Sequence, residues 1–202
     1  MLLDGSRWPV PLMIGCTVGE TRGPIVAKSM EDYRQLAVAS FGEEAAEEYM
    51  KILGNDVQLA NDIVRINGAE VGVRVMKEMD KKNGVDNPIY FYRFNPEMPG
   101  YDHPGTFHSS DLWFYFENLA KCWRPFTGKH YDLARQMCNA WAWFFKNGDP
   151  NGKDVTGLPQ EQWKQFTLDE KNIMYWGDKP EPYVDQDSDV MKFLVGQMMK
   201  QL

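Results

Sequence analysis

The sequence predicts an α/β fold that is mostly helix and holds two or three strands. Residues Val10–Cys16 form a near-continuous apolar run, and residues Pro88–Phe94 form a second run rich in aromatic side chains. Runs of this length and composition are typical of strands buried in a sheet. Segments with helical spacing of apolar residues separate and follow the two runs, which favours a sheet covered by helices. Two or three strands are too few for a complete sheet of this class, so we expect part of one.

The first run, VPLMIGC, predicts a strand buried on both faces, with Pro11 near its start, where a missing donor costs least. It is followed directly by TVGETRG, in which two glycines bracket the carboxylate of Glu20. Functional residues of open α/β sheets gather at the carboxyl ends of strands, so Glu20 is a candidate site residue. The alternative is a turn glutamate paired with Arg22.

Helical patterns fill residues 29–83, between the two strand-like runs. Ser29 is placed to cap a helix over 30–40, and Gly42 separates it from a helix over 43–53. Asn55 is expected to cap a third helix that reaches Gly68, and a fourth follows over 69–82. Nothing in this stretch has catalytic character, and its acidic residues predict a solvated helix face.

A loop, a histidine and a helical pattern follow the second strand-like run. Residues 95–106 form a loop rich in proline and glycine, and His108 follows just before an apolar helical pattern that begins near Asp111. We expect this helix, over about 111–120, to be well buried because it is apolar nearly all round.

The C-terminal third predicts one long helix, one short strand and a terminal helix. Aromatic side chains recur at helical spacing over 129–147, which indicates core packing. A loop over 149–167 follows, then a short edge strand over 172–176 and a second loop over 179–187. The terminal helix is expected to begin at Ser188 or Asp189.

Composition excludes several classes of protein and site. A net charge of −7 and a pI near 5.0 argue against nucleic-acid binding. No run approaches the about 20 apolar residues of a membrane span, and the N-terminus lacks the pattern of a signal peptide, so we expect a cytoplasmic protein with no membrane partner. Three cysteines without a CxxC pair and three histidines without metal-ligand spacing predict no disulfide framework, no metal and no cofactor.

Glu20 and His108 together indicate nucleophilic catalysis. A carboxylate that orients an imidazole, which in turn activates a hydroxyl, is the arrangement of acyl-transfer enzymes. No serine lies in G-x-S-x-G and no glycine run suggests an oxyanion hole, so the nucleophile is expected to come from outside this chain. Cys16 as a substitute nucleophile has no evident base. His103 and His130 are predicted to be surface or loop histidines.

Several segments carry a family resemblance over nearly the whole chain. They are PLMIGCTVGET, PIYFYRF, GTFHSSDLWFYF, WRPFTG, NAWAWFFKNGDPN and LPQEQWKQFT. In this order they resemble the C-terminal part of the type B carboxylesterases, the α/β-hydrolase family of cholinesterases and para-nitrobenzyl esterases. The resemblance implies that Glu20 is the triad acid, that His108 is the triad base, and that Asp111 matches a nearby acidic residue, usually Glu, that supports the site. The family's N-terminal part, with its nucleophile, has no match here, and the segment before Val10 departs from the family.

Two functional hypotheses follow for residues 1–202, taken as one incomplete α/β-hydrolase domain. In the first, the chain supplies acid and base to a serine nucleophile carried by an N-terminal esterase half, and the pair hydrolyses a small-molecule carboxylic ester. In the second, the chain is a non-catalytic module that self-associates as a homo-oligomer through an uncovered sheet edge and helix faces.

Overall fold

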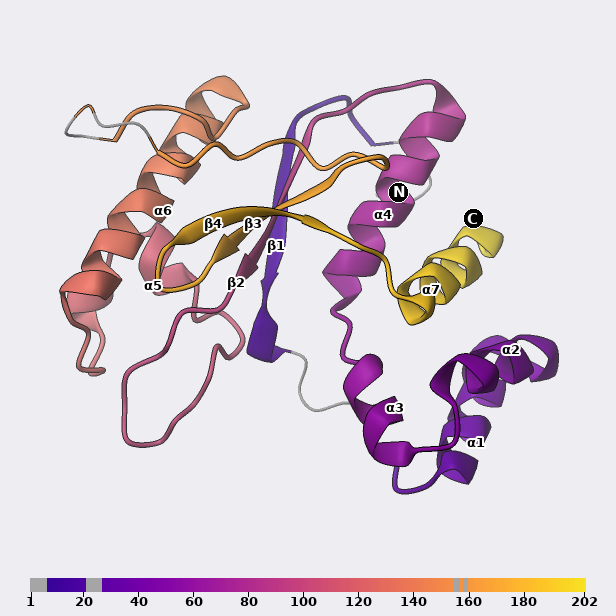
Figure 1. The fold of residues 1–202 in the computed structure, drawn as a ribbon. Coiled ribbons are helices and arrows are strands. Elements are labelled where there is room, and N and C mark those ends of the chain that lie inside the picture. Colours follow the sequence, from indigo (N-terminus) through magenta and orange to yellow (C-terminus); the bar gives the residue numbers. More distant parts are fainter. Residues whose placement is uncertain (1–6, 21–26, 155–156, 158–159) are drawn as a thin grey trace.

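The computed structural model describes residues 7–20, 27–154, 157 and 160–202, and its centre is a mixed sheet of four strands (Figure 1). The strands are β1 (Leu12–Thr17), β2 (Ile89–Phe94), β3 (Lys171–Trp176) and β4 (Pro180–Asp185), in that order across the sheet. The first three run parallel, and β4 is antiparallel to β3. The predicted α/β class is therefore confirmed.

The far side of the sheet differs from the prediction. The expected edge strand, β3, lies inside the sheet, and residues 179–187, expected to be loop, contain the edge strand β4. The sequence of β4, PEPYVD, does not indicate a strand, because prolines and acidic residues are uncommon in strands. An edge position tolerates them, since proline can sit where no ladder donor is needed.

The alternating side chains of β2 divide the core between the two faces of the sheet. Tyr90, Tyr92 and Phe94 pack on one face with residues of α6 (Gly128–Asn147). Ile89 and Phe91 pack on the other face with residues of α4 (Gly68–Asn83). Figure 1 shows α6 and α4 on opposite sides of the sheet. The strand is buried on both faces, as its apolar run predicts.

Strand β1 is less buried than predicted. Residues Leu12–Gly15 are only partly buried, and burial is complete only at Cys16 and Thr17. Among the described strands, β1 pairs with β2 alone, so it forms the other edge of the sheet. The expected burial on both faces is wrong for most of the strand, because an edge strand lacks a neighbour on one side.

The helices of residues 29–83 and the C-terminus pack together beside the sheet. They are α1 (Met30–Phe41), α2 (Glu43–Leu53), α3 (Val57–Ile63), α4 and α7 (Asp189–Lys200). The Ser29 hydroxyl accepts from the Asp32 N–H at 3.1 Å, which confirms the predicted cap. Helix α3 is shorter than predicted, and Asp56 caps it in place of Asn55. No helix in the described part of the chain is long and apolar enough to cross a bilayer.

The helix predicted over 111–120 is largely replaced by turns. Only α5 (Leu112–Tyr115) is α-helical, and a 3₁₀ turn, η2 (Leu119–Lys121), follows it. Glu117 has a left-handed backbone, with φ of 49°, which is incompatible with a continuing helix. As a result Phe116 is 65% exposed rather than buried.

A network of buried and partly buried charges joins α4 to the sheet. Arg74 donates to Asp185 at 2.7 Å and to Asp187 at 2.6 Å. Arg93 donates to Glu70 at 2.7 Å and to the same Asp185 at 3.1 Å. Charge-assisted bonds of this kind compensate the desolvation of buried ions only while every partner is present.

We expect Arg74→Ala to lower the free energy of unfolding by about 3 kcal/mol, because it removes the buried cation that Asp185 and Asp187 share. Among the described residues, the two carboxylates keep only the contacts at 3.1 Å with Arg93 and at 3.4 Å with Lys171.

The matched control is Arg65→Ala. Arg65 pairs with Asp62 at 3.7 Å on the exposed surface, and its loss should cost about 0–1 kcal/mol. Urea denaturation of both variants measures the difference, and equal effects would contradict a structural role for the network.

Candidate active site

Glu20 ends a 3₁₀ turn, η1 (Val18–Glu20), that follows β1 directly. Its Oε2 atom accepts from the backbone N–H and from the hydroxyl of Thr17, both at 3.3 Å. Thr17 is the last residue of the strand and is buried. The carboxylate is therefore fixed to the strand by one oxygen, and the other oxygen, Oε1, points away from it. Arg22, the alternative partner, lies outside the described residues.

His108 lies in the loop that follows β2, and its ring meets the free oxygen of Glu20. Nδ1 of His108 is hydrogen-bonded to Oε1 of Glu20, although 88 residues separate them. The backbone turns sharply on both sides of His108, with φ of 59° at Gly105 and 66° at Ser109. The two predicted site residues are thus brought together at the carboxyl ends of neighbouring parallel strands.

The pair has the geometry of a general base and its orienting acid. A carboxylate that accepts from Nδ1–H fixes the tautomer of a neutral imidazole and leaves Nε2 free to accept a proton. The His108 side chain is 70% exposed and that of Glu20 is 28% exposed. Among the described residues Glu20 is the one hydrogen-bond partner of His108. Within the described ranges no group is hydrogen-bonded to Nε2.

Asp111, the predicted supporting residue, lies three positions after His108 and is buried. Its Oδ2 atom accepts from the hydroxyl of Tyr92 at 2.9 Å. Burial raises the pKa of the Asp111 carboxyl, the Tyr92 hydrogen bond lowers this pKa, and the charge of Glu20 raises it. The net effect is a raised pKa, so the folded protein disfavours the ionised form of Asp111.

The remaining candidates have structural surroundings. Cys16 is buried, its thiol faces Glu70 Oε1 at 3.8 Å, and burial raises its pKa above the ordinary value, so a nucleophilic thiolate is disfavoured. His103 is exposed, as predicted. His130 is buried, which corrects its prediction as a surface or loop residue. Its Nδ1 accepts from the Thr127 N–H at 3.0 Å and so caps α6.

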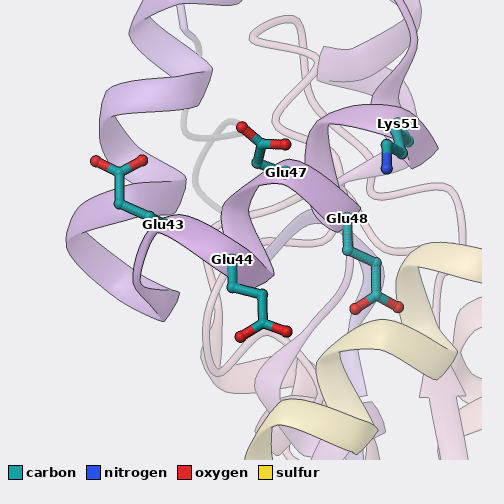
Figure 2. Close-up of a pocket in the computed structure, with 5 residues that line it drawn as sticks. All are labelled: Glu43, Glu44, Glu47, Glu48 and Lys51. Carbon is teal, nitrogen blue, oxygen red and sulfur yellow. The ribbon is translucent and has the colours of Figure 1, made fainter.

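An acidic hollow on α2 is unrelated to this site. Figure 2 shows its lining side chains spread apart along the helix. They are Glu43, Glu44, Glu47, Glu48 and Lys51. Arg34 lies 3.5 Å from Glu43 and 3.7 Å from Glu47, so the face is solvated and partly neutralised. No group of three or more potential metal ligands occurs in the described ranges.

The chain is similar to known esterases in sequence and in fold. The model of the carboxylesterase family matches residues 10–193, so the chain belongs to that family. It is 27% identical to human cocaine esterase over an alignment of 199 residues that covers 83% of this chain and 35% of the human protein.

Two solved structures show the same fold. A PNB esterase is 21% identical, has a TM-score of 0.66 and matches 96% of this chain with 40% of its own. An esterase from anaerobic Clostridium hathewayi, described as able to hydrolyse aliphatic aromatic polyesters, is 22% identical, has a TM-score of 0.55 and matches 95% of this chain with 38% of its own. The chain therefore has part of an α/β-hydrolase fold and spans little more than a third of the length of these proteins.

Sequence reasoning missed the polar residues that hold the pair. Thr17 fixes Glu20, Tyr92 bonds Asp111, and Thr106 contacts the turn that carries Glu20. A weak local signal existed only for Thr17, since a threonine three positions before a carboxylate can form a local hydrogen bond with it. The other two bonds join segments far apart in the chain.

We expect Asp111→Asn to raise the free energy of unfolding at pH 7. Because the folded-state pKa of Asp111 is raised, the charged form is disfavoured in the folded protein, and stability falls as the pH rises through that pKa. The neutral amide can still accept from Tyr92 and avoids this loss. Urea denaturation of the variant and of the wild type, at pH 7 and near pH 3.5, measures the difference in the free energy of unfolding. The variant should be the more stable protein at pH 7, and this difference should be smaller at the lower pH. A destabilised variant at pH 7 would contradict an electrostatic cost at Asp111.

Proposed function

We propose that this chain supplies the acid and the base of a serine carboxylesterase. The observation that carries the proposal is the hydrogen bond between His108 Nδ1 and Glu20 Oε1, with Nε2 left open. Membership of the carboxylesterase family supports it. The substrates are small-molecule carboxylic esters, and hydrolysis proceeds through an acyl-enzyme.

In this mechanism His108 moves one proton in each direction. Its Nε2 takes the proton of a serine hydroxyl as the oxygen attacks the ester carbonyl, and it returns that proton to the leaving alcohol. Water then repeats the sequence on the acyl-serine and releases the acid. Glu20 holds the ring in the required tautomer and stabilises the imidazolium, and Asp111 supports the site from its buried position nearby.

The serine and the oxyanion hole come from another polypeptide segment in this proposal. Within the described ranges no hydroxyl is hydrogen-bonded to His108. The partner is an N-terminal esterase half with a G-E-S-A-G elbow and a glycine-rich loop, and it also forms most of the acyl pocket. The cytoplasmic location and the assignment of residues 1–202 as one incomplete domain stay predictions.

The proposal is tested by complementation. We expect co-expression with an N-terminal half of this family to give hydrolysis of para-nitrophenyl esters that neither part gives alone. His108→Ala in the mixture should lower kcat by at least about a thousandfold, and Glu20→Gln by about 10⁴-fold if it imposes the wrong tautomer. Rates of para-nitrophenol release measure both effects.

The control is Arg65→Ala, which changes an exposed ion pair on α3's flank and should leave the rate unchanged. If the purified chain alone hydrolysed the ester and His108→Ala abolished this activity, the need for an external nucleophile would be contradicted. Unchanged turnover by His108→Ala in the mixture would contradict the assigned base.

The alternative, a non-catalytic module that self-associates, is favoured by one observation at the sheet edge. Strand β1 has no described neighbour beyond β2. Trp8 is 83% exposed and Val10 is 56% exposed just before this strand. An open strand edge beside exposed apolar side chains is the type of surface that pairs with another chain.

For this alternative we expect the purified chain to form a homo-oligomer at micromolar concentration. Pairing through the open edge of β1 should be weakened by Met13→Pro. The Leu12 N–H donates to the Pro88 carbonyl and so points into the sheet, whereas the N–H of the next residue points to the open edge, where proline removes a donor. The matched variant Val184→Lys changes an exposed residue of the opposite edge strand, β4. Light scattering measures both, and a stable monomer would contradict the module hypothesis.

A further inference from the structure

The acid and the base of the candidate site reach each other from two separate loops, and only one of the two is fixed locally. Glu20 is held by Thr17 in the adjoining strand. The exposed ring of His108 has no such local anchor, since its described hydrogen bond is the one to Glu20. The distance between the two loops therefore decides whether the pair forms.

Thr106 is the residue that sets this distance. It lies two positions before His108 and is 1% exposed. Its hydroxyl oxygen accepts from the Gly19 N–H at 3.1 Å, one residue before Glu20. The two backbones are in close contact there, because a Cβ atom built on Gly19 would lie 2.5 Å from the Thr106 carbonyl oxygen.

The same hydroxyl is tied to two further strand ends. It donates to the side-chain oxygen of Asn95 at 3.0 Å. Asn95 follows β2, and its backbone N–H donates to the Trp176 carbonyl at 2.8 Å, at the end of β3. Its side-chain nitrogen donates to the Tyr175 hydroxyl at 2.7 Å. One buried hydroxyl thus joins the carboxyl ends of β1, β2 and β3, because it donates one hydrogen bond and accepts another.

We propose that Thr106 is a positioning residue that holds the Glu20 turn and the His108 loop in register, so that the acid–base pair forms. The inference rests on the proposed function and adds to it a residue outside the triad. A threonine suits this position because its hydroxyl accepts and donates at once, while its methyl group fills a buried site. Valine keeps the shape and loses both hydrogen bonds, and serine keeps both bonds.

The test uses the full chain labelled with ¹⁵N-histidine, since ring ¹⁵N shifts report which nitrogen carries the proton. At a pH where the rings are neutral, we expect His108 to carry its proton on Nδ1 in the wild type. Thr106→Val should lose this state and shift towards the Nε2–H form that free imidazole side chains favour, whereas Thr106→Ser should keep it. His108→Ala assigns the signal.

His130 provides an internal control for folding. Its Nδ1 accepts from Thr127 and its Nε2 faces the Glu97 carbonyl at 3.1 Å, so its signal should be the same in every folded variant. If Thr106→Val does not fold, Thr106→Ala removes the hydroxyl without adding an atom and tests the same loss. A His108 signal unchanged in the folded variant would overturn the inference.

The outcome for Glu20→Ala separates this inference from the proposed function. If the wild type and Glu20→Ala give the same His108 signal, the acid–base pair does not form and the proposed function fails with the inference. If Glu20→Ala loses the Nδ1–H state and Thr106→Val keeps it, the pair stands and only the role of Thr106 fails. Loss in both variants, with retention in Thr106→Ser, supports both.

Discussion

The candidate site depends on the parallel pairing of β1 with β2 in one register. Thr17 at the end of β1 pairs with Phe94 at the end of β2, so the two chains leave the sheet at the same level. The pairing is close because Gly15 presents no side chain where the Tyr92 ring lies. A register shift of one residue would reverse the faces of β1 and separate Glu20 from His108. The strand pairing therefore sets the level at which the two loops begin, and the contact between Gly19 and Thr106 then joins the loops.

The carboxylates discussed above have two kinds of partner, either a cation or a neutral hydroxyl. Around Arg74 and Arg93 the buried and partly buried carboxylates have cationic partners, and the network holds α4 to the sheet. Asp111 is buried with a tyrosine hydroxyl as its hydrogen-bond donor, and burial raises its pKa. A charge kept at a cost to stability is typical of functional sites, whereas a fully paired network is typical of structural ones. The contrast favours a functional reading of Asp111.

The sequence predicted the parts whose signals are local. Apolar runs indicated β1 and β2, helical spacing indicated α4 and α6, and their order placed Glu20 and His108 at strand ends. Strand β4 was missed because its prolines are permitted only by its edge position, which is a property of the sheet. Thr106 was missed because its partner Gly19 lies 87 residues away. A hydroxyl that joins two loops produces no periodic pattern in the sequence, so its hydrogen bonds are visible only in the folded structure.

The two functional hypotheses make different demands on the residues around His108. Self-association through the edge of β1 requires an open strand and apolar neighbours, and it has no use for an ordered carboxylate–imidazole pair. Yet Glu20 has each oxygen engaged, the Thr106 hydroxyl both donates and accepts, and Asp111 places a carboxyl in a buried position. The placement of these polar groups at adjoining strand ends favours the catalytic proposal.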